Sequence, residues 1–174
     1  GNVSRLVSQK RVSRLMEAQV FLPENARLAI AGDGPLRGAL GQKARALRIR
    51  DRVHFLGHQQ NIAPLLDAVD VLVITSNREG MSSAMLEAMA RGVPVISTDV
   101  SGAREALEPD AEGQAPGLVT GFAPPEIASA LNSVLYDRSI LDEMGHTAKR
   151  CYRERFSYER MLDEWEGLFY DTPR

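Results

Sequence analysis

The sequence predicts an α/β fold in which helices cover both faces of a doubly wound parallel sheet. Short apolar runs alternate with helical patterns over residues 1–120, and this spacing forms right-handed strand–helix–strand units. After Pro125 only helical patterns follow, so extra helices complete the domain. At 174 residues the chain is one domain, residues 1–174, with a sizeable core. The predicted architecture is Rossmann-like, with additional C-terminal helices.

The predicted strands are short runs of apolar and β-branched residues. They cover residues 3–8, 26–31, 53–56, 69–76, 94–100 and, on a weaker pattern, 117–120. The run 69–76 is apolar over most of its length, as expected of a strand that is buried on both faces of a parallel sheet.

The predicted helices fill the gaps between these strands. They cover residues 13–21, 35–47, 61–68, 83–90 and 102–107. Pro35 suits the first position of its helix, and Gly92 followed by Pro94 ends the helix 83–90. Residues 109–116 form a surface loop.

The last helix carries an apolar stripe with helical spacing. The stripe consists of Tyr158, Met161, Leu162, Trp165, Leu168 and Phe169. We expect it to be covered either by the flank of this sheet or by a domain absent from the chain.

Charge and cysteine content exclude several classes of protein. The net charge of −2 argues against a nucleic-acid partner and against electrostatic attachment to a membrane. The single cysteine, Cys151, excludes an internal disulfide and a cysteine-based metal cluster. No apolar run reaches the length of a membrane span, and no signal peptide is visible. We therefore expect a cytoplasmic protein, peripheral at most to the inner membrane face, and its start at Gly1 suggests a segment of a longer one.

Glu79 and Glu87 bracket the N-terminus of the predicted helix 83–90, and this is the most informative feature of the sequence. Glu87 is the only charge between Gly80 and Arg91, where burial of a carboxylate is costly without hydrogen-bond partners. The two carboxylates could accept hydrogen bonds from hydroxyl groups, and the amides at the helix N-terminus could bind phosphate. This combination would suit a nucleotide-sugar. Alternatively, Glu79 complements the helix dipole and Glu87 reaches solvent.

The loops at the carboxyl ends of the strands are the expected ligand site of such a sheet. The first strand ends in the segment from Arg5 to Lys10, which sets two cations at the carboxyl edge of the sheet. There a guanidinium and an ammonium group would bind a diphosphate. The alternative is that both are ordinary surface charges.

Gly32 and Gly34 follow the second strand, in a turn that could cradle a phosphate or simply join a strand to a helix. With Gly38 they give only a weak likeness to a dinucleotide fingerprint, so an NAD site is disfavoured.

Gly57 follows the third strand and would let the backbone approach a flat base. His54 and His58 lack carboxylate or cysteine partners at ligand spacing, so no metal site is expected, and His146 is expected at the surface. No serine-nucleophile motif occurs. The pair Ser82-Ser83 is better explained as a helix cap.

Taken together, these segments resemble the glycosyltransferases of the GT-B fold, most closely the retaining family 4 group. The resemblance covers essentially the whole chain, as the C-terminal, nucleotide-sugar-binding half of that fold. It rests on the order of the segments 5–10, 31–36, 51–57, 79–89, 94–99 and 155–157.

The resemblance implies a role for each site residue. Arg5 and Lys10 would hold the donor diphosphate and stabilise the leaving nucleotide, and Glu79 would contact the donor sugar. Glu87 would accept hydrogen bonds from the ribose. The remaining donor-binding residues would be Gly32, Gly34, Leu56, Gly57, His58, Gly80, Met81, Ser82 and Ser83.

The resemblance also implies the chemistry. Such enzymes generally need no metal or other cofactor, because cations take its place, and they retain the anomeric configuration through front-face attack. A UDP-sugar is the favoured donor. The acceptor would bind an N-terminal domain that this chain lacks, so the isolated chain would be inactive.

Three positions depart from the family pattern, and three other functions remain open. Met81 and Ser82 stand where an aromatic residue and a glycine are usual, which leaves the sugar undetermined, and Arg11 stands where glycine is common. The alternatives are a nucleotide-sugar isomerase or epimerase, an oxidoreductase cofactor domain, and a non-catalytic binding module.

Overall fold

The computed structural model describes residues 1–110 and 112–170, with side chains as far as residue 167. Its strands are β1 (Asn2–Val3), β2 (Leu28–Ala31), β3 (Val53–Gly57), β4 (Leu72–Ile74), β5 (Val95–Thr98) and β6 (Gly117–Thr120). Its α-helices are α1 (Val12–Ala18), α2 (Arg37–Ala46), α3 (Ala63–Ala68), α4 (Ser83–Arg91), α5 (Ser101–Ala106), α6 (Pro124–Leu135), α7 (Arg138–Cys151) and α8 (Tyr158–Tyr170). Short 3-10 helices lie at η1 (Ser8–Lys10), η2 (Gln19–Phe21) and η3 (Arg50–Arg52), and a π-helix lies at η4 (Tyr152–Phe156).

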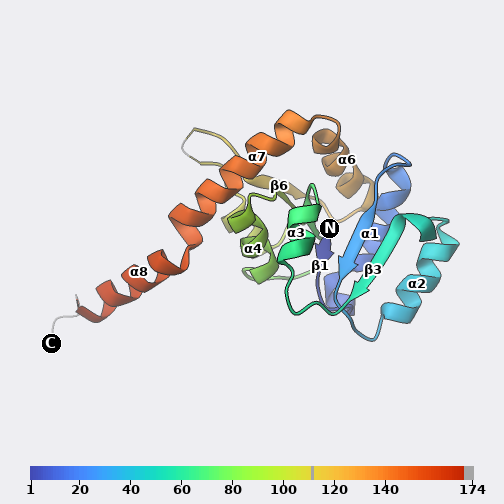
Figure 1. Ribbon diagram of the computed structural model, residues 1–174, viewed down its shortest axis with the longest axis horizontal. Helices are drawn as coiled ribbons and strands as arrows, with labels where there is room; N and C mark the ends of the chain where they lie inside the picture. The colour runs from blue at the N-terminus through green and yellow to red at the C-terminus, as the bar shows by residue number, and fades with distance from the viewer. Residues whose placement is uncertain (111, 171–174) are drawn as a thin grey trace.

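All paired strands run parallel, which confirms the predicted fold class. The order β1-β2-β3 forms one half of the sheet and β4-β5-β6 the other. The halves meet where the Val73 N–H donates to the Gly1 carbonyl at 2.8 Å and the Asn2 amide donates to the Val73 carbonyl at 2.8 Å. The spatial order is therefore β3-β2-β1-β4-β5-β6, as in doubly wound nucleotide-binding domains (Figure 1).

Each face of the sheet has its own core, which explains why β4 is apolar throughout. Val71, Val73 and Ile96 point into a core shared with α1, α2 and α6. Leu72 and Val95 point the other way, into a core shared with α3, α4 and α5. Because successive strand residues face opposite sides, a strand covered on both faces needs apolar residues at every position.

The first predicted strand is wrong over most of its length. Only Asn2 and Val3 pair with β2, whereas residues 3–8 were expected to do so. Beyond Val3 the chain turns, and the Leu6 N–H donates to the Asp33 carbonyl at 2.9 Å. Leu6 is buried from this loop, so its apolar character reflects tertiary packing and not strand pairing.

The described part of the last helix's apolar stripe is exposed, contrary to the possibility that the stripe covers the flank of the sheet. Figure 1 shows α8 projecting from the body of the domain beyond α7. Tyr158, Met161, Leu162 and Trp165 are between 41% and 63% exposed. The other members of the stripe lie outside the described side chains.

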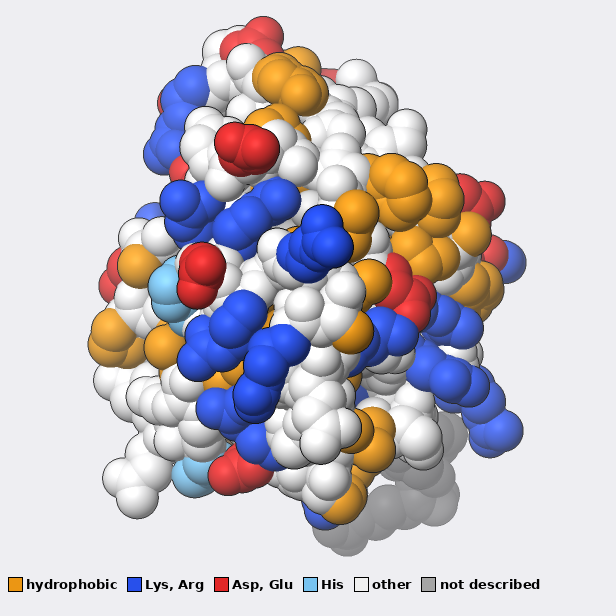
Figure 2. Space-filling view, turned by 90° about the vertical axis from the view of Figure 1, so that its right-hand side faces the viewer, with side chains coloured by type: hydrophobic (Ala, Val, Ile, Leu, Met, Phe, Trp, Pro, Cys, Tyr) orange, Lys and Arg blue, Asp and Glu red, His pale blue; other side chains and the backbone are white. Residues whose placement is uncertain are grey.

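Charge is unevenly distributed along the chain. Residues 1–58 contain 11 Lys and Arg but only 4 Asp and Glu, so the net charge of −2 conceals a basic N-terminal part. Figure 2 shows Lys and Arg side chains gathered on the side of the molecule where α2 lies. None of the described helices is long and apolar enough to cross a membrane.

Candidate functional site

A cleft of about 720 Å³ lies at the carboxyl ends of β1, β2 and β3, beside the N-terminus of α4. It brings together Arg5, Lys10, Gly32, His58, Glu79, Met81, Ser82 and Ser83 from the predicted site. Its other lining residues are Val3, Ser4, Ala31, Asp33, Gln59, Ile62 and Ala84. Gly34, Leu56, Gly57, Gly80 and Glu87 do not line it.

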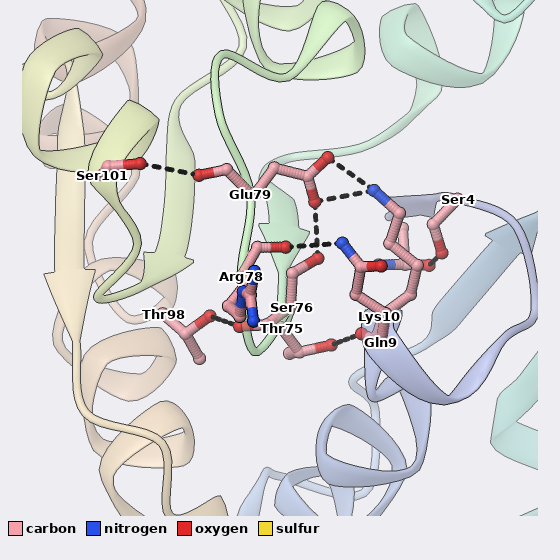
Figure 3. Close-up of polar contacts among 10 residues, drawn as sticks. Ser4, Gln9, Lys10, Thr75, Ser76, Arg78, Glu79, Thr98 and Ser101 are labelled. Atoms are coloured by element: carbon pink, nitrogen blue, oxygen red, sulfur yellow. Dashed lines mark hydrogen bonds and ion pairs between the residues drawn. The ribbon is translucent and has the colours of Figure 1, made fainter.

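Lys10 and Glu79 form an ion pair in this cleft (Figure 3). Lys10 Nζ lies 2.5 Å and 2.7 Å from the two carboxylate oxygens of Glu79. The side chains are 23% and 15% exposed, respectively, so the pair is largely shielded from water. The Ser76 hydroxyl donates to Glu79 Oε2 at 2.6 Å. The carboxylate therefore has a charged partner and a neutral one.

The loop that carries Glu79 is tied to the turn that carries Lys10. The Thr75 hydroxyl donates to the Lys10 carbonyl at 3.0 Å, and the Asn77 N–H donates to the Gln9 carbonyl at 2.9 Å. The Gln9 amide in turn donates to the Arg78 carbonyl at 2.9 Å. These bonds fix the relative position of two segments that are far apart in the sequence.

Gly32 and Gly34 let the loops after β1 and β2 pack closely. A Cβ atom at Gly32 would lie 1.9 Å from the Ser4 carbonyl oxygen, and one at Gly34 would lie 2.7 Å from that of Leu6. Both glycines also have positive φ angles, of 132° and 157°. Close backbone contact thus aligns the segment that carries Arg5 along the end of β2. Their assignment to the donor stays a prediction.

The N-terminus of α4 faces the cleft. Ser82 is the N-cap residue, with φ −84° and ψ 122°, but its side chain makes no capping hydrogen bond. The predicted position of the helix cap is therefore confirmed, but the capping hydrogen bond from the serine side chain is not formed. Because the positive end of the helix dipole and its first N–H groups lie beside the cleft, they favour an anion there.

Glu87 is exposed, which confirms the alternative that it reaches solvent and rules out a carboxylate buried in apolar surroundings. The buried residues of α4 are Ala84, Met85, Ala88 and Met89, which share the opposite face of the helix. Glu87 instead follows Ser83 by one turn on the same side. It therefore lies next to the cleft without lining it, and its contact with ribose stays a prediction.

The loop after β3 forms another wall, through His58, Gln59 and Ile62. Gly57 turns the chain there with a φ of 70°, and its carbonyl accepts from the Gly32 N–H at 2.7 Å. Sequence reasoning missed Gln59 and Ile62, although their place just after the third strand was a usable signal. It also missed Ser76, the last residue of the predicted run 69–76.

No metal-binding group of three or more His, Cys, Asp or Glu side chains occurs in the part of the chain that the structure describes. His54, His58 and His146 are all exposed, as expected for His146.

The fold and the cleft define a doubly wound α/β domain with cations and a helix N-terminus at the carboxyl edge of its parallel sheet, where ligands of such domains bind. Comparison with known families is more specific. Residues 1–151 match the glycosyl transferases group 1 family, and the chain belongs to this family.

Related proteins are glycosyltransferases or synthases. The chain is 33% identical to N-acetyl-alpha-D-glucosaminyl L-malate synthase of Bacillus anthracis, over 99% of the chain and 45% of that protein. It is 31% identical to the lipopolysaccharide core biosynthesis glycosyltransferase LpsE of Rhizobium meliloti, over 99% of the chain and 49% of that protein. The chain thus spans about half the length of these relatives.

Solved structures show the same fold. Anabaena Alr3699/HepE in complex with UDP superimposes with a TM-score of 0.90 and 26% identity, over 99% of the chain and 48% of that protein. The glycosyltransferase WaaG superimposes with a TM-score of 0.80 at 23% identity, over 98% of the chain and 47% of WaaG, which supports the GT-B fold alone.

Proposed function

We propose that this chain is the donor-binding domain of a retaining, family 4-type glycosyltransferase, and that its donor is a UDP-sugar. The observation that carries the proposal is the convergence of Arg5, Lys10 and the N-terminus of α4 on one cleft. Two cations and a set of helix N–H groups match the charge of a diphosphate. Membership of the glycosyl transferases group 1 family supports sugar transfer as the reaction.

Three features support UDP as the nucleotide and Glu79 as the group that meets the sugar. The related structure of Alr3699/HepE contains UDP. The residues 56–58 offer backbone beside the cleft for a base. Glu79 lies at the cleft beside Lys10, so a sugar attached to a diphosphate held by Lys10 would be within reach of the carboxylate.

The length of the relatives supports a division of labour between two domains. The chain spans about half of them, and in our proposal the acceptor binds an N-terminal domain outside it. Arg5 and Lys10 take the place of a metal ion at the diphosphate. The bond between the anomeric carbon and the donor phosphate breaks, and UDP leaves with its charge stabilised by Arg5 and Lys10. The departing phosphate takes the proton of the acceptor hydroxyl, whose oxygen bonds to the anomeric carbon from the same face, so the configuration is retained. Alone, the chain binds the donor and transfers no sugar.

Calorimetric titration with UDP, GDP and ADP, with and without EDTA, tests the proposal. We expect UDP to bind most tightly and EDTA to have no effect, because the partners of the diphosphate are side chains. Arg5→Ala should weaken the binding of UDP by about 1.5–3 kcal/mol, the scale of hydrogen bonds to charged groups. The binding of uridine, which lacks phosphates, should be weakened much less.

Arg45→Ala is the matched control, because Arg45 is an exposed cation on α2 that does not line the cleft. Binding that needs magnesium or manganese, or equal losses in the Arg5 and Arg45 variants, would contradict this account of the site. Interconversion of UDP-sugars without an acceptor would favour the isomerase or epimerase alternative.

A further inference from the structure

We propose that Ser76 and Ser101 are positioning residues for Glu79, and that they act from opposite sides of its loop. The inference rests on the proposed function, in which Glu79 contacts the transferred sugar. A carboxylate on a loop discriminates between sugar hydroxyls only if its orientation is fixed, because ordering a free side chain on binding costs conformational entropy. Glu79 lies on such a loop, between β4 and α4.

Ser76 holds the side chain of Glu79. Its hydroxyl donates to Glu79 Oε2 at 2.6 Å, and Ser76 itself is only 1% exposed. The Ser76 carbonyl accepts from the Thr98 hydroxyl at 2.7 Å, so this serine is anchored to β5 as well (Figure 3). Lys10 contacts both carboxylate oxygens, whereas Ser76 contacts only one. Ser76 therefore distinguishes the two oxygens and sets the rotation of the carboxylate.

Ser101 holds the main chain of Glu79. Its hydroxyl donates to the Glu79 carbonyl at 3.0 Å, across the loop from Ser76. The next residue, Gly102, is buried, and a Cβ atom there would lie 2.1 Å from the Gly80 carbonyl oxygen. The start of α5 therefore packs directly on the Glu79 loop, at a distance that only glycine permits.

The two contacts together fix Glu79 relative to the sheet. Ser76 follows β4 and Ser101 follows β5, and these neighbouring strands pair in parallel through Leu72–Ile74 and Val95–Ser97. Glu79 thus takes its position from the rigid centre of the domain, although the residue itself lies on a loop. Neither serine lines the cleft, whereas Ser101 lines a neighbouring hollow together with Glu79 and Gly80. In this proposal both serines act through Glu79.

A double-mutant cycle tests this inference, with calorimetric binding of UDP-glucose and of UDP to the 174-residue chain. Ser76→Ala and Ser101→Ala should each lower the affinity for UDP-glucose by about three- to tenfold, the scale of one hydrogen bond. Both variants should bind UDP with unchanged affinity. In a Glu79→Ala background neither serine substitution should have a further effect, because the group that they position is gone.

Ser133→Ala is the matched control, since Ser133 is an exposed serine on α6 whose hydroxyl also donates to a backbone carbonyl. Circular dichroism establishes that each variant folds. If Ser76→Ala does not fold, Ser101→Ala carries the test, because its hydrogen bond is at the surface.

Each outcome is decisive. Equal weakening of UDP and UDP-glucose, an undiminished effect in the Glu79→Ala background, or no effect of either serine would overturn the positioning role. Failure of the unsubstituted chain to bind either ligand would overturn the proposed function instead, and the positioning role with it.

Discussion

Lys10 and Glu79 are ion-paired across the cleft, although 69 positions separate them in the sequence. The cation assigned to the donor diphosphate therefore neutralises the carboxylate assigned to the donor sugar. When the donor binds, the ammonium group of Lys10 has to interact with both this carboxylate and the phosphate oxygens. The pair thus links the two halves of the proposed donor site, and its removal should affect both stability and binding.

Lys10→Ala should lower the free energy of unfolding by about 1–3 kcal/mol, because it leaves a shielded carboxylate without its cation. Urea unfolding measures the loss. In the double variant Lys10→Ala/Glu79→Ala part of the stability should return, since no unpaired charge remains. Lys43→Ala is the control: its partner Glu17 is 34% exposed, and such a pair contributes about 1 kcal/mol or less. Equal losses at the two lysines would show that burial of the Glu79 pair has no energetic consequence.

Glu79→Ala and Glu87→Ala should separate the sugar from the ribose. Glu79→Ala should weaken the binding of a UDP-sugar by about 1–3 kcal/mol and should not weaken the binding of UDP, because it removes the sugar contact and frees Lys10 for the phosphate oxygens. Glu87→Ala should weaken both ligands alike, because every nucleotide carries a ribose. Calorimetry with UDP and UDP-glucose measures the difference. Normal binding of both ligands by both variants would mean that neither glutamate meets the donor.

Glu87→Ala should leave the fold nearly as stable as before. The carboxylate is exposed, so its removal relieves no burial cost, and alanine exceeds glutamate in helix propensity by only a few tenths of a kcal/mol, or about 0.5 at most. Thermal unfolding followed by circular dichroism checks this. A loss of several degrees in the midpoint would reveal a structural role that the exposed position does not suggest.

Gly32→Ala should be strongly destabilising. The new Cβ would overlap the Ser4 carbonyl oxygen at 1.9 Å, and the φ of 132° is one that alanine rarely adopts. We expect a loss of about 1–3 kcal/mol or more in the free energy of unfolding. Gly41→Ala, within α2, meets no atom within 4 Å and should instead stabilise the protein by about 0.5–1 kcal/mol. Chemical denaturation of both variants compares them, and equal tolerance would contradict the tight loop packing.

Cys151 should react slowly with iodoacetamide in the native state. The side chain is 1% exposed, and burial raises the pKa of its thiol, so the reactive thiolate is scarce and inaccessible. Mass spectrometry would show alkylation only after unfolding in urea. Rapid alkylation of the folded protein would place α7 away from the core against which it packs here.

Local signals in the sequence predicted most elements, and contacts between distant segments explain the errors. The run 117–120 is a strand and helix 83–90 is off by one residue, because alternation, apolar periodicity and flanking glycine or proline act locally. The run 3–8 contains enough apolar residues to suggest a strand, yet Leu6 is buried from a loop held by Asp33. Burial alone does not reveal whether a residue pairs or packs.

The candidate site was predictable in its residue types and not in its contacts. Lys10 and Glu79 follow predicted strands and Arg5 lies within the first one, and the rule that ligands meet the carboxyl ends of strands placed them at one edge. The pairing of Lys10 with Glu79 depends on the neighbourhood of β1 and β4, which no local pattern encodes. The sequence left the burial of Glu87 open, because an apolar composition does not tell which face of a helix is covered, and one face of α4 stays in water.

The projection of α8 has a spectroscopic consequence. Trp165 is the single tryptophan of the chain, and it is 58% exposed on this helix. Intrinsic tryptophan emission therefore reports the surroundings of α8 and scarcely those of the sheet. Its wavelength should stay red-shifted while the sheet remains folded, and should move to the blue when another surface covers the helix.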